Sequence, residues 1–218
     1  MNDYSSLEKC PLFKGLAEKE IVAILDCLNA KTKSYTRGSY VFEAGQKVIS
    51  IGIVTSGCVN IVQDDFWGNR TILASVGPND IFGEAFSCAD ILEMPVSAIC
   101  VEKSEIMLID YRKVATTCTS ACVFHTKLIG NMISILANKN VMLTKKIEHI
   151  SKRNTREKIL SYLSEQARQN QKSSFTIPFD RQGLADYLAV DRSAMSYVLS
   201  KLRDEGIIKY NKNEFELL

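Results

Sequence analysis

The spacing of apolar residues divides the chain into segments of different kinds. Up to about residue 29, apolar residues recur at helical spacing, which predicts helix. From Lys31, short runs rich in β-branched and aromatic residues alternate with turn residues, a pattern typical of a closed β-roll, barrel or sandwich. From Tyr111 to about Gln171 the spacing is helical again. We expect one break there, because Asn154 can cap a second helix.

Individual strands and helices follow from the same spacing. Six short runs are expected to form strands: 40–42, 51–54, 59–62, 71–73, 97–101 and 106–109. After the polar loop 169–174, we expect a short strand at 175–177, two helices, and a β-hairpin that turns at 211–213. The chain is therefore predicted to have a mainly β part followed by a mainly helical part.

A heptad pattern runs through the long helical segment over about three repeats. Its a and d positions alternate in steps of four and three: Ile129, Ile133, Leu136, Asn140, Leu143, Ile147 and Ile150. Isoleucine at a with mostly leucine at d favours a parallel two-stranded coiled coil, in which one Asn at an a position fixes the register. We predict a homodimer held by residues 122–150. A helix buried in the core of its own chain is the alternative.

A second apolar stripe lies beside this heptad seam and consists of Leu128, Met132, Ile135 and Met142. We expect the stripe to pack on the β-rich part of the chain. One helix would then contact both its twin and that part, which is a suitable geometry for transmitting a signal.

Residues 181–202 have the spacing of a helix-turn-helix, with Asp191 as the N-cap of the second helix. The expected core positions are Leu184, Ala185, Leu188, Met195, Val198 and Leu202. The opposite face of the second helix carries hydroxyl and basic groups, which suit base edges and phosphates. This predicted DNA-binding face consists of Arg192, Ser193, Ser196, Tyr197, Ser200 and Lys201. The hairpin that follows Gly206 makes it a winged version; a plain helical pair with a polar face is the alternative.

Composition and charge add modest constraints. The 218 residues are 46% hydrophobic and 24% charged, as in an ordinary folded protein. The net charge of +2 divides into +4 from Lys145 onward (14 Lys and Arg, 10 Asp and Glu) and −2 before it, so the C-terminal third can meet nucleic acid. We expect no membrane helix, no signal peptide and seven reduced cysteines, hence a cytoplasmic protein.

The order of these parts resembles the CRP/FNR family of bacterial transcription regulators. The resemblance rests on Pro11-Leu12-Phe13 in the N-terminal helix, Phe82-Gly83-Glu84 in the β-rich part, the dimer helix and the winged helix-turn-helix. Residues 151–160 are similar to the FNR branch. The family implies an α+β fold with three parts: an effector-sensing double-stranded β-helix (β-roll) at 1–118, a dimerisation helix at 119–152 and a winged helix-turn-helix at 153–218.

The same resemblance implies a function and its partners. The expected protein is a homodimeric regulator that binds palindromic double-stranded DNA and meets RNA polymerase if it is an activator. Arg192 matches the arginine that begins the family's recognition helix, and Ser196 matches a base-contacting serine of the FNR branch. Tyr197 replaces an arginine that commonly binds guanine, so the half-site should differ from that of the best-known members.

The family's cyclic AMP cassette is incomplete in this chain. Phe82, Gly83 and Glu84 are present, but Val96 stands where an arginine should neutralise the phosphate. A buried phosphate without a countercharge is costly, so we expect a small organic or hydrophobic effector, or none, in place of cyclic AMP. The wall of the predicted effector pocket consists of Phe82, Gly83, Glu84, Val96, Ser97, Met132, Ile135 and Met142.

Three other classes of function are alternatives. A cyclic-nucleotide-dependent signalling module would share the β-roll but not the helix-turn-helix. A redox- or haem-responsive regulator would use Cys118 and Cys122, one helical turn apart, or the histidines His125 and His149. We predict no metal site and no enzyme, because the chain has no nucleophile motif, phosphate loop or metal-ligand group. The residues identify neither a cofactor nor the effector.

Overall fold

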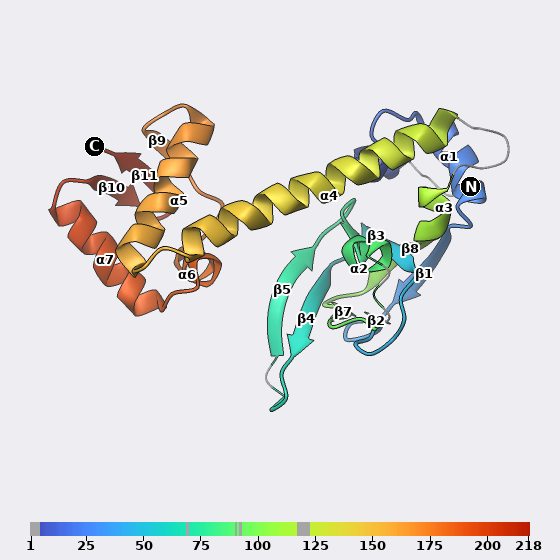
Figure 1. The fold of residues 1–218 in the computed structure, drawn as a ribbon, viewed down its shortest axis with the longest axis horizontal. Coiled ribbons are helices and arrows are strands. Elements are labelled where there is room, and N and C mark those ends of the chain that lie inside the picture. The colour runs from blue at the N-terminus through green and yellow to red at the C-terminus, as the bar shows by residue number, and fades with distance from the viewer. Residues whose placement is uncertain (1–4, 69, 90, 92, 117–122) are drawn as a thin grey trace. The chain divides into compact units, whose positions relative to one another are not determined.

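The computed structural model describes residues 5–68, 70–89, 91, 93–116 and 123–218 (Figure 1). The chain forms two compact units, Met1–Ala137 and Asn138–Leu218, each of which is described by itself. Cys118 and Cys122, and with them the proposed thiol pair, lie outside the described residues.

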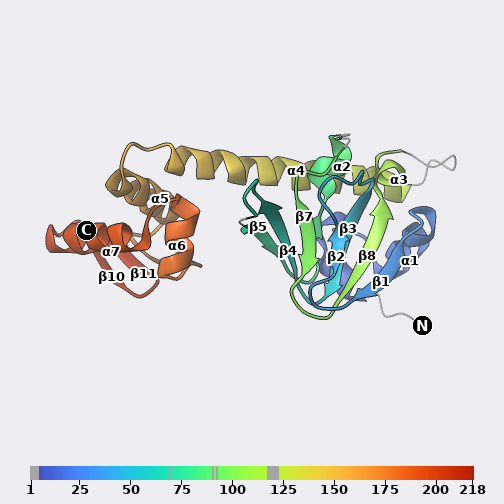
Figure 2. The ribbon, with the colours of Figure 1, turned by 90° about the horizontal axis from the view of Figure 1, so that it is seen from below.

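Two antiparallel four-stranded sheets form the body of the N-terminal unit (Figure 2). One has the strand order β1-β8-β3-β6, formed by Lys31–Tyr35, Ser104–Asp110, Ser50–Ser56 and Ile81–Phe82. The other has the order β2-β7-β4-β5, formed by Tyr40–Phe42, Ser97–Cys100, Val59–Asp64 and Arg70–Val76. The six predicted strands are all present. β1 and β6 were missed, β1 because its residues are polar and mostly exposed and β6 because it has two residues.

An apolar core, here called the roll core, fills the interior of this unit. Its buried members are Phe42, Val54, Val59, Val76, Phe82, Met94, Val96, Ala98, Cys100 and Ile106. Phe82 packs over Gly52, where an added Cβ would lie 2.3 Å from the ring. Phe42 and Phe82 stack with ring centroids 5.4 Å apart. Phe82, the first residue of the Phe82-Gly83-Glu84 sequence, is therefore held by Phe42 and Gly52.

A second core, here called the helix-side core, covers the other face of the β3-containing sheet. Neighbouring residues of a strand point to opposite faces, so Ile53 joins this core while Val54 joins the roll core. The helices that complete it are η1 (Ser5–Lys9), η2 (Pro11–Phe13), α1 (Glu18–Cys27), α3 (Tyr111–Ala115) and the first part of α4 (Val123–Ile150).

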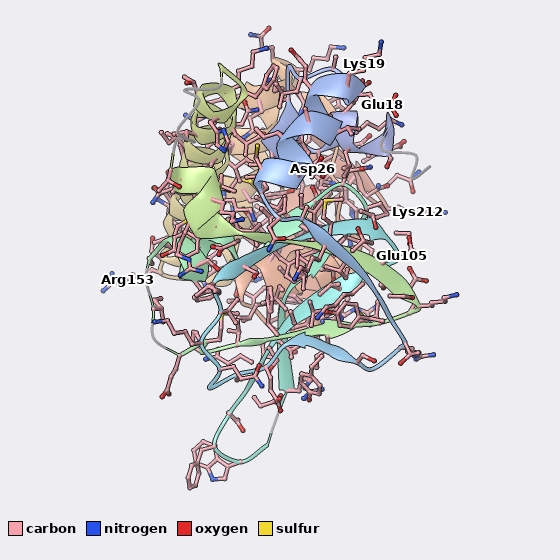
Figure 3. The ribbon with its side chains drawn as sticks, turned by 90° about the vertical axis from the view of Figure 1, so that its right-hand side faces the viewer. Glu18, Lys19, Asp26, Glu105, Arg153 and Lys212 are labelled. Carbon is pink, nitrogen blue, oxygen red and sulfur yellow. The ribbon has the colours of Figure 1, made fainter. Side chains whose placement is uncertain are left out.

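Helix α1 is amphipathic and explains the apolar stripe of the first segment. Ile21, Ile24 and Leu25 are buried in the helix-side core. Glu18, Lys19 and Asp26 lie on its outer side (Figure 3). Asn131 of α4 donates hydrogen bonds to the carbonyls of Leu12 and Lys14, each at 2.9 Å, and so fixes α4 to η2.

The C-terminal unit begins with the second part of α4. Its elements are α5 (Thr155–Asn170), β9 (Ser174–Thr176), α6 (Arg181–Leu188), α7 (Arg192–Asp204), β10 (Ile208–Asn211) and β11 (Glu214–Leu217). The strands form one antiparallel sheet in the order β10-β11-β9. As predicted, α5 begins after Asn154, whose side chain accepts a hydrogen bond from the Glu157 amide at 2.9 Å.

The predicted α+β class, with a β N-terminal part, a long helix and a winged helix-turn-helix, is confirmed by this architecture. One core position differs: Leu199 is fully buried on α7, whereas Val198, the predicted residue, is only half-buried. Among the described residues, no helix is both long and apolar enough to cross a membrane.

Candidate nucleic-acid interface

The caps of α6 and α7 set the geometry of the helix-turn-helix. The Asp180 side chain accepts from the Gly183 amide at 2.7 Å, and the Asp191 side chain accepts from the Ala194 amide at 2.8 Å. Between the helices, Ala189 adopts a left-handed conformation with φ of 50°. Ala185 is fully buried, so the helices can cross closely. These local interactions hold α7 in place with one face outward.

The outward face of α7 carries most of the predicted DNA-binding side chains. Arg192, Ser193, Ser196, Tyr197 and Lys201 are exposed. The Lys201 Nζ lies 5.1 Å from the centroid of the Tyr197 ring, so an aromatic ring and a cation form one contact patch. Ser200 differs from the prediction, because it is half-buried and its Oγ lies 3.5 Å from the Tyr210 hydroxyl of the wing.

Sequence reasoning assigned no role to the residues beside Arg192. A hollow of about 560 Å³ brings Arg192 together with the start of α6 and the turn of the wing. Gln182 comes from α6, and Lys212 from the β10–β11 turn, where its φ is 52°. The sequence predicts this turn at 211–213. Its basic residue, Lys212 between two asparagines, is the feature from which a phosphate contact could have been predicted. Arg192 and Lys212, together with Arg181, give this hollow three basic side chains beside the carboxylate of Asp180. Basic groups suit a phosphate backbone.

A buried polar cluster joins the end of α4 to α5; we call it the junction cluster. His149 is 2% exposed and its Nε2 lies 3.0 Å from a carboxylate oxygen of Glu165, while its Nδ1 lies 2.8 Å from the Ser161 Oγ. Lys145 Nζ and Gln169 Nε2 also contact Glu165, at 2.5 and 2.8 Å. Both ring nitrogens of His149 thus face protein oxygens, so a metal ion would have to displace one of these partners.

The predicted dimer seam is largely unpaired in the single chain. Ile133, Leu143 and Ile147 are 61, 61 and 60% exposed, and Asn140 is exposed as well. The other seam positions, Ile129, Leu136 and Ile150, are half-buried. The alternative of a helix buried in its own core is therefore wrong for the middle of α4. A row of large apolar residues exposed on one helix is typical of an interaction surface.

The residues predicted to line the effector pocket are divided between two cores of the N-terminal unit. Phe82 and Val96 belong to the roll core, whereas Met132 and Ile135 belong to the helix-side core, on the opposite face of the intervening sheet. Met142 belongs to the C-terminal unit, and its expected packing on the β-rich part stays a prediction. Leu128, the remaining residue of the second stripe, is buried in the helix-side core.

The remaining cassette residues serve the fold around α2 (Glu84–Cys88). Gly83 has φ of 81°, and an added Cβ would lie 2.8 Å from the Phe42 ring, so only glycine fits. Glu84 is buried at the start of α2. Ser97 is buried, and its Oγ accepts a hydrogen bond from the Ala44 amide at 3.0 Å. Gly83 and Ser97 therefore have structural roles in the fold around α2.

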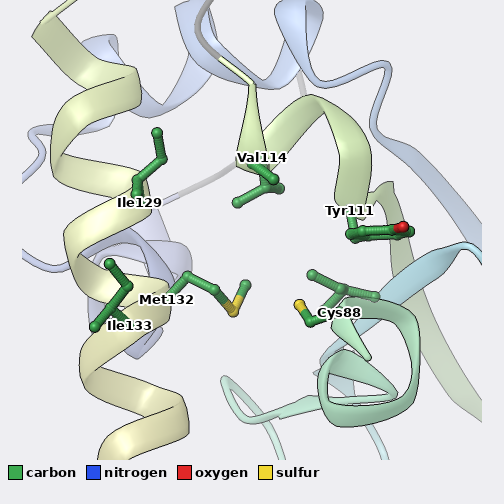
Figure 4. Close-up of a pocket in the computed structure, with 8 residues that line it drawn as sticks. Cys88, Tyr111, Val114, Ile129, Met132 and Ile133 are labelled. Atoms are coloured by element: carbon green, nitrogen blue, oxygen red, sulfur yellow. The ribbon is translucent and has the colours of Figure 1, made fainter. Parts of the chain in front are cut away.

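A smaller cavity, here called the α4 cavity, lies on the outer side of β3 (Figure 4). It has a volume of about 160 Å³. Its lining includes Cys88, Tyr111, Val114, Ile129, Met132 and Ile133. Of the predicted pocket residues, Met132 is among those that line it. Within the described part of the chain, no three or more His, Cys, Asp or Glu side chains gather as a metal site would require.

Comparison with known proteins places these features in context. Residues 32–120 match the cyclic nucleotide-binding domain family, and residues 157–218 match the Crp-like helix-turn-helix domain family. Over 211 residues the chain is 27% identical to the cyclic AMP receptor protein of Thermus thermophilus, with 95% of this chain and 92% of that protein covered.

Solved structures agree on the fold. The catabolite activator protein of Thermus thermophilus is 25% identical, with a TM-score of 0.51 and coverage of 95% of this chain and 93% of that one. The c-di-GMP responsive global regulator CLP of Xanthomonas campestris is 18% identical, with a TM-score of 0.58 and coverage of 89% and 97%. The second likeness concerns the fold alone.

Proposed function

Because this chain belongs to the CRP/FNR family of transcription regulators, we propose that it acts as a homodimer that reads a palindromic DNA site through α7. The observation that carries the proposal is the outward face of α7, with Arg192 beside the wing residue Lys212. Its action on DNA makes the cytoplasm the expected location. RNA polymerase is a further partner if the protein activates transcription.

The side chains of α7 and the wing divide into two roles. Arg192, Ser196 and Tyr197 are exposed near the start of α7, the part of a recognition helix that contacts base edges. Lys201, Gln182 and Lys212 are the candidates for phosphate contacts, which fix the position of a protein on the duplex. Ser193 is exposed and can serve either role, whereas Ser200 is half-buried against the wing and supports it.

The dimer follows from the exposed seam of α4. Its heptad positions suit a parallel coil, and two recognition helices related by a twofold axis would enter major grooves about 34–36 Å apart. The DNA site should therefore be an inverted repeat. Sites selected from random duplexes by the purified protein would reveal this symmetry.

The test of the interface compares two arginines of the C-terminal unit. Arg192→Ala should weaken binding to the selected site by about 1–3 kcal/mol, or about 5- to 150-fold, and relax the preference at one base pair per half-site if it contacts a base. If Arg192 contacts only phosphate, affinity falls evenly across sequences and its salt dependence shrinks. Fluorescence anisotropy with labelled duplexes measures both.

Arg168→Ala is the matched control. Arg168 is exposed near the end of α5, so this variant removes the same charge from the same unit away from α7. It should bind DNA nearly as the parent does. An Arg192→Ala variant with unchanged affinity and unchanged salt dependence would remove α7 from the interface.

We also propose that cyclic AMP is not the effector. Val96 is buried in the roll core, so a phosphate at the cassette would meet an aliphatic side chain where the family has an arginine. An unpaired buried anion costs several kcal/mol. Titration calorimetry with cyclic AMP should show no binding in the micromolar range, and micromolar affinity would contradict the proposal.

A further inference from the structure

The α4 cavity has the size and lining of a small-molecule site. Its volume of about 160 Å³ is close to that of a protein cavity that holds benzene, about 150 Å³. Its walls come from segments far apart in the chain: Ile51 of β3, Cys88 of α2, Val114 of α3 and Met132 of α4. Figure 4 shows the Met132 thioether extending from α4 toward Cys88, with Val114 across from it.

The lining selects the chemistry of the occupant. No Lys, Arg, Asp or Glu is among the described side chains that line the cavity, so a charged group would enter without a partner, at high cost. The Met132 and Cys88 sulfurs are polarizable, and sulfur makes favourable contacts with aromatic rings. An uncharged ring of about the size of benzene or toluene therefore suits the cavity better than a phosphate or a carboxylate.

Two residues of the lining also belong to the dimer seam. Ile129 and Ile133 line the cavity from α4 and occupy consecutive d and a positions of the heptad pattern. A molecule in the cavity contacts these side chains from one side, while the second helix of a dimer packs on the same part of α4. A ligand that changes the packing of Ile129 and Ile133 in the cavity therefore also changes how these side chains pack in the dimer seam.

We propose that the α4 cavity binds a small uncharged apolar molecule and that its occupancy is linked to dimerisation through Ile129 and Ile133. The regulatory part of this inference rests on the proposed function, because dimerisation would hold the two recognition helices in register. Linkage is reciprocal: if the ligand tightens the dimer, dimerisation tightens ligand binding by the same factor.

The test uses the full-length protein and toluene as the probe. Cys88 lines the cavity, while Cys27 is exposed on α1 and does not line it. Toluene should slow alkylation of Cys88 by iodoacetamide at least threefold and leave Cys27 unchanged, as peptide mass spectrometry would measure. Benzoate, a charged molecule of similar size, should protect neither thiol. Equal protection by benzoate, or no protection by toluene, would overturn the inference.

A cavity-filling variant provides the second readout. Ala115 lines the cavity and is exposed, so Ala115→Phe can fill the cavity without disturbing a core. In this variant toluene should no longer change the Cys88 rate, with an unchanged circular dichroism melt as the control for folding. Persistent protection in the variant would place toluene elsewhere and overturn the inference.

The linkage is measured by sedimentation. Toluene should shift the dimer dissociation constant of the parent protein at least twofold and leave that of Ala115→Phe unchanged. If toluene protects Cys88 only in a monomeric variant such as Leu143→Glu, a second copy fills the cavity and the inference is wrong. DNA binding of the parent protein is measured separately. If toluene protects Cys88 but the protein binds no DNA site, the proposed function is rejected and the cavity proposal stands. If the protein binds DNA but toluene does not protect Cys88, only the cavity proposal is rejected.

Discussion

At Glu165 of the junction cluster, burial and charge have opposite effects on the pKa. Burial alone would raise it, but the hydrogen bond and charge of Lys145, with smaller contributions from Gln169 and His149, hold the pKa of this carboxyl below its usual range. A lowered pKa in the folded state stabilises the protein above the unfolded value of about 4.3, and that stability is lost as the pH falls through the folded value.

Glu165→Gln is therefore expected to lower the free energy of unfolding at pH 7 by about 1–3 kcal/mol, because Lys145 and His149 lose their anionic partner. The difference from the parent should shrink as the pH falls below about 4, where the parent carboxylate also takes up a proton. Urea denaturation across this pH range measures both effects.

Glu148→Gln is the control for this prediction. Glu148 is an exposed glutamate on α4 close to the junction cluster, so its substitution should change stability by no more than about 0.5 kcal/mol. If the two variants lose the same stability at every pH, the junction cluster contributes nothing specific.

At the scale of elements, α4 carries an exposed apolar surface that suits the proposed dimer. Leu143 is 61% exposed, so a charge there costs the isolated chain little. In a two-stranded coil, Leu143→Glu would place two carboxylates opposite each other in an apolar seam. The variant should sediment as a monomer and keep the parent's helical circular dichroism.

Asn138→Glu is the matched control for α4. Asn138 is exposed on the same helix, at an f position outside the seam. This variant should remain a dimer. A dimeric Leu143→Glu variant would mean that the chains associate through another surface.

The strands and helices also show how much of the fold the pattern of apolar and polar residues predicts. β3, β4, β7 and β8 could be predicted because each has a run of buried apolar residues. β1 could not, because its Lys-Thr-Lys-Ser sequence gains its structure from hydrogen bonds to β8 and not from burial. On α7, the predicted core residues Met195 and Leu202 are buried. Leu199 is buried as well, whereas its predicted neighbour Val198 is only half-buried.

The candidate sites also differ in how much of each could be predicted from the sequence. The predicted DNA-binding face lies on one helix, and five of the six side chains that its periodicity predicts are exposed. The α4 cavity could not be found from periodicity, because its walls meet only after β3, α2, α3 and α4 have packed. The resemblance to the family predicts the effector at Phe82 and Val96, and both side chains are buried in the roll core.

At the scale of the whole molecule, two compact units with separate cores should unfold in two transitions. Differential scanning calorimetry at fixed protein concentration would resolve them. Gly83→Ala should lower only the transition of the N-terminal unit, by roughly 3–8 °C, because Gly83 has a positive φ and an added Cβ would lie 2.8 Å from the Phe42 ring. Glu165→Gln should lower only the other transition.

Gly130→Ala is the control substitution for the first unit. An added Cβ at Gly130 of α4 meets no atom within 4 Å, so alanine should stabilise the helix by about 0.5–1 kcal/mol. A single transition that all three variants shift together would contradict the picture of two separately folded units.

The middle of α4 has a consequence for the lifetime of its backbone hydrogen bonds. Residues 137–144 are all exposed in the single chain, so over two turns the helix has little side-chain packing of its own. Backbone amides in such a segment open locally and exchange with solvent long before a packed core does. In a coiled coil the second helix would cover the seam at Asn140 and Leu143 and so slow this local opening. The exchange rate of the amide hydrogens in the middle of α4 therefore reports on subunit association: fast exchange indicates a separate chain, and slow exchange indicates a paired one.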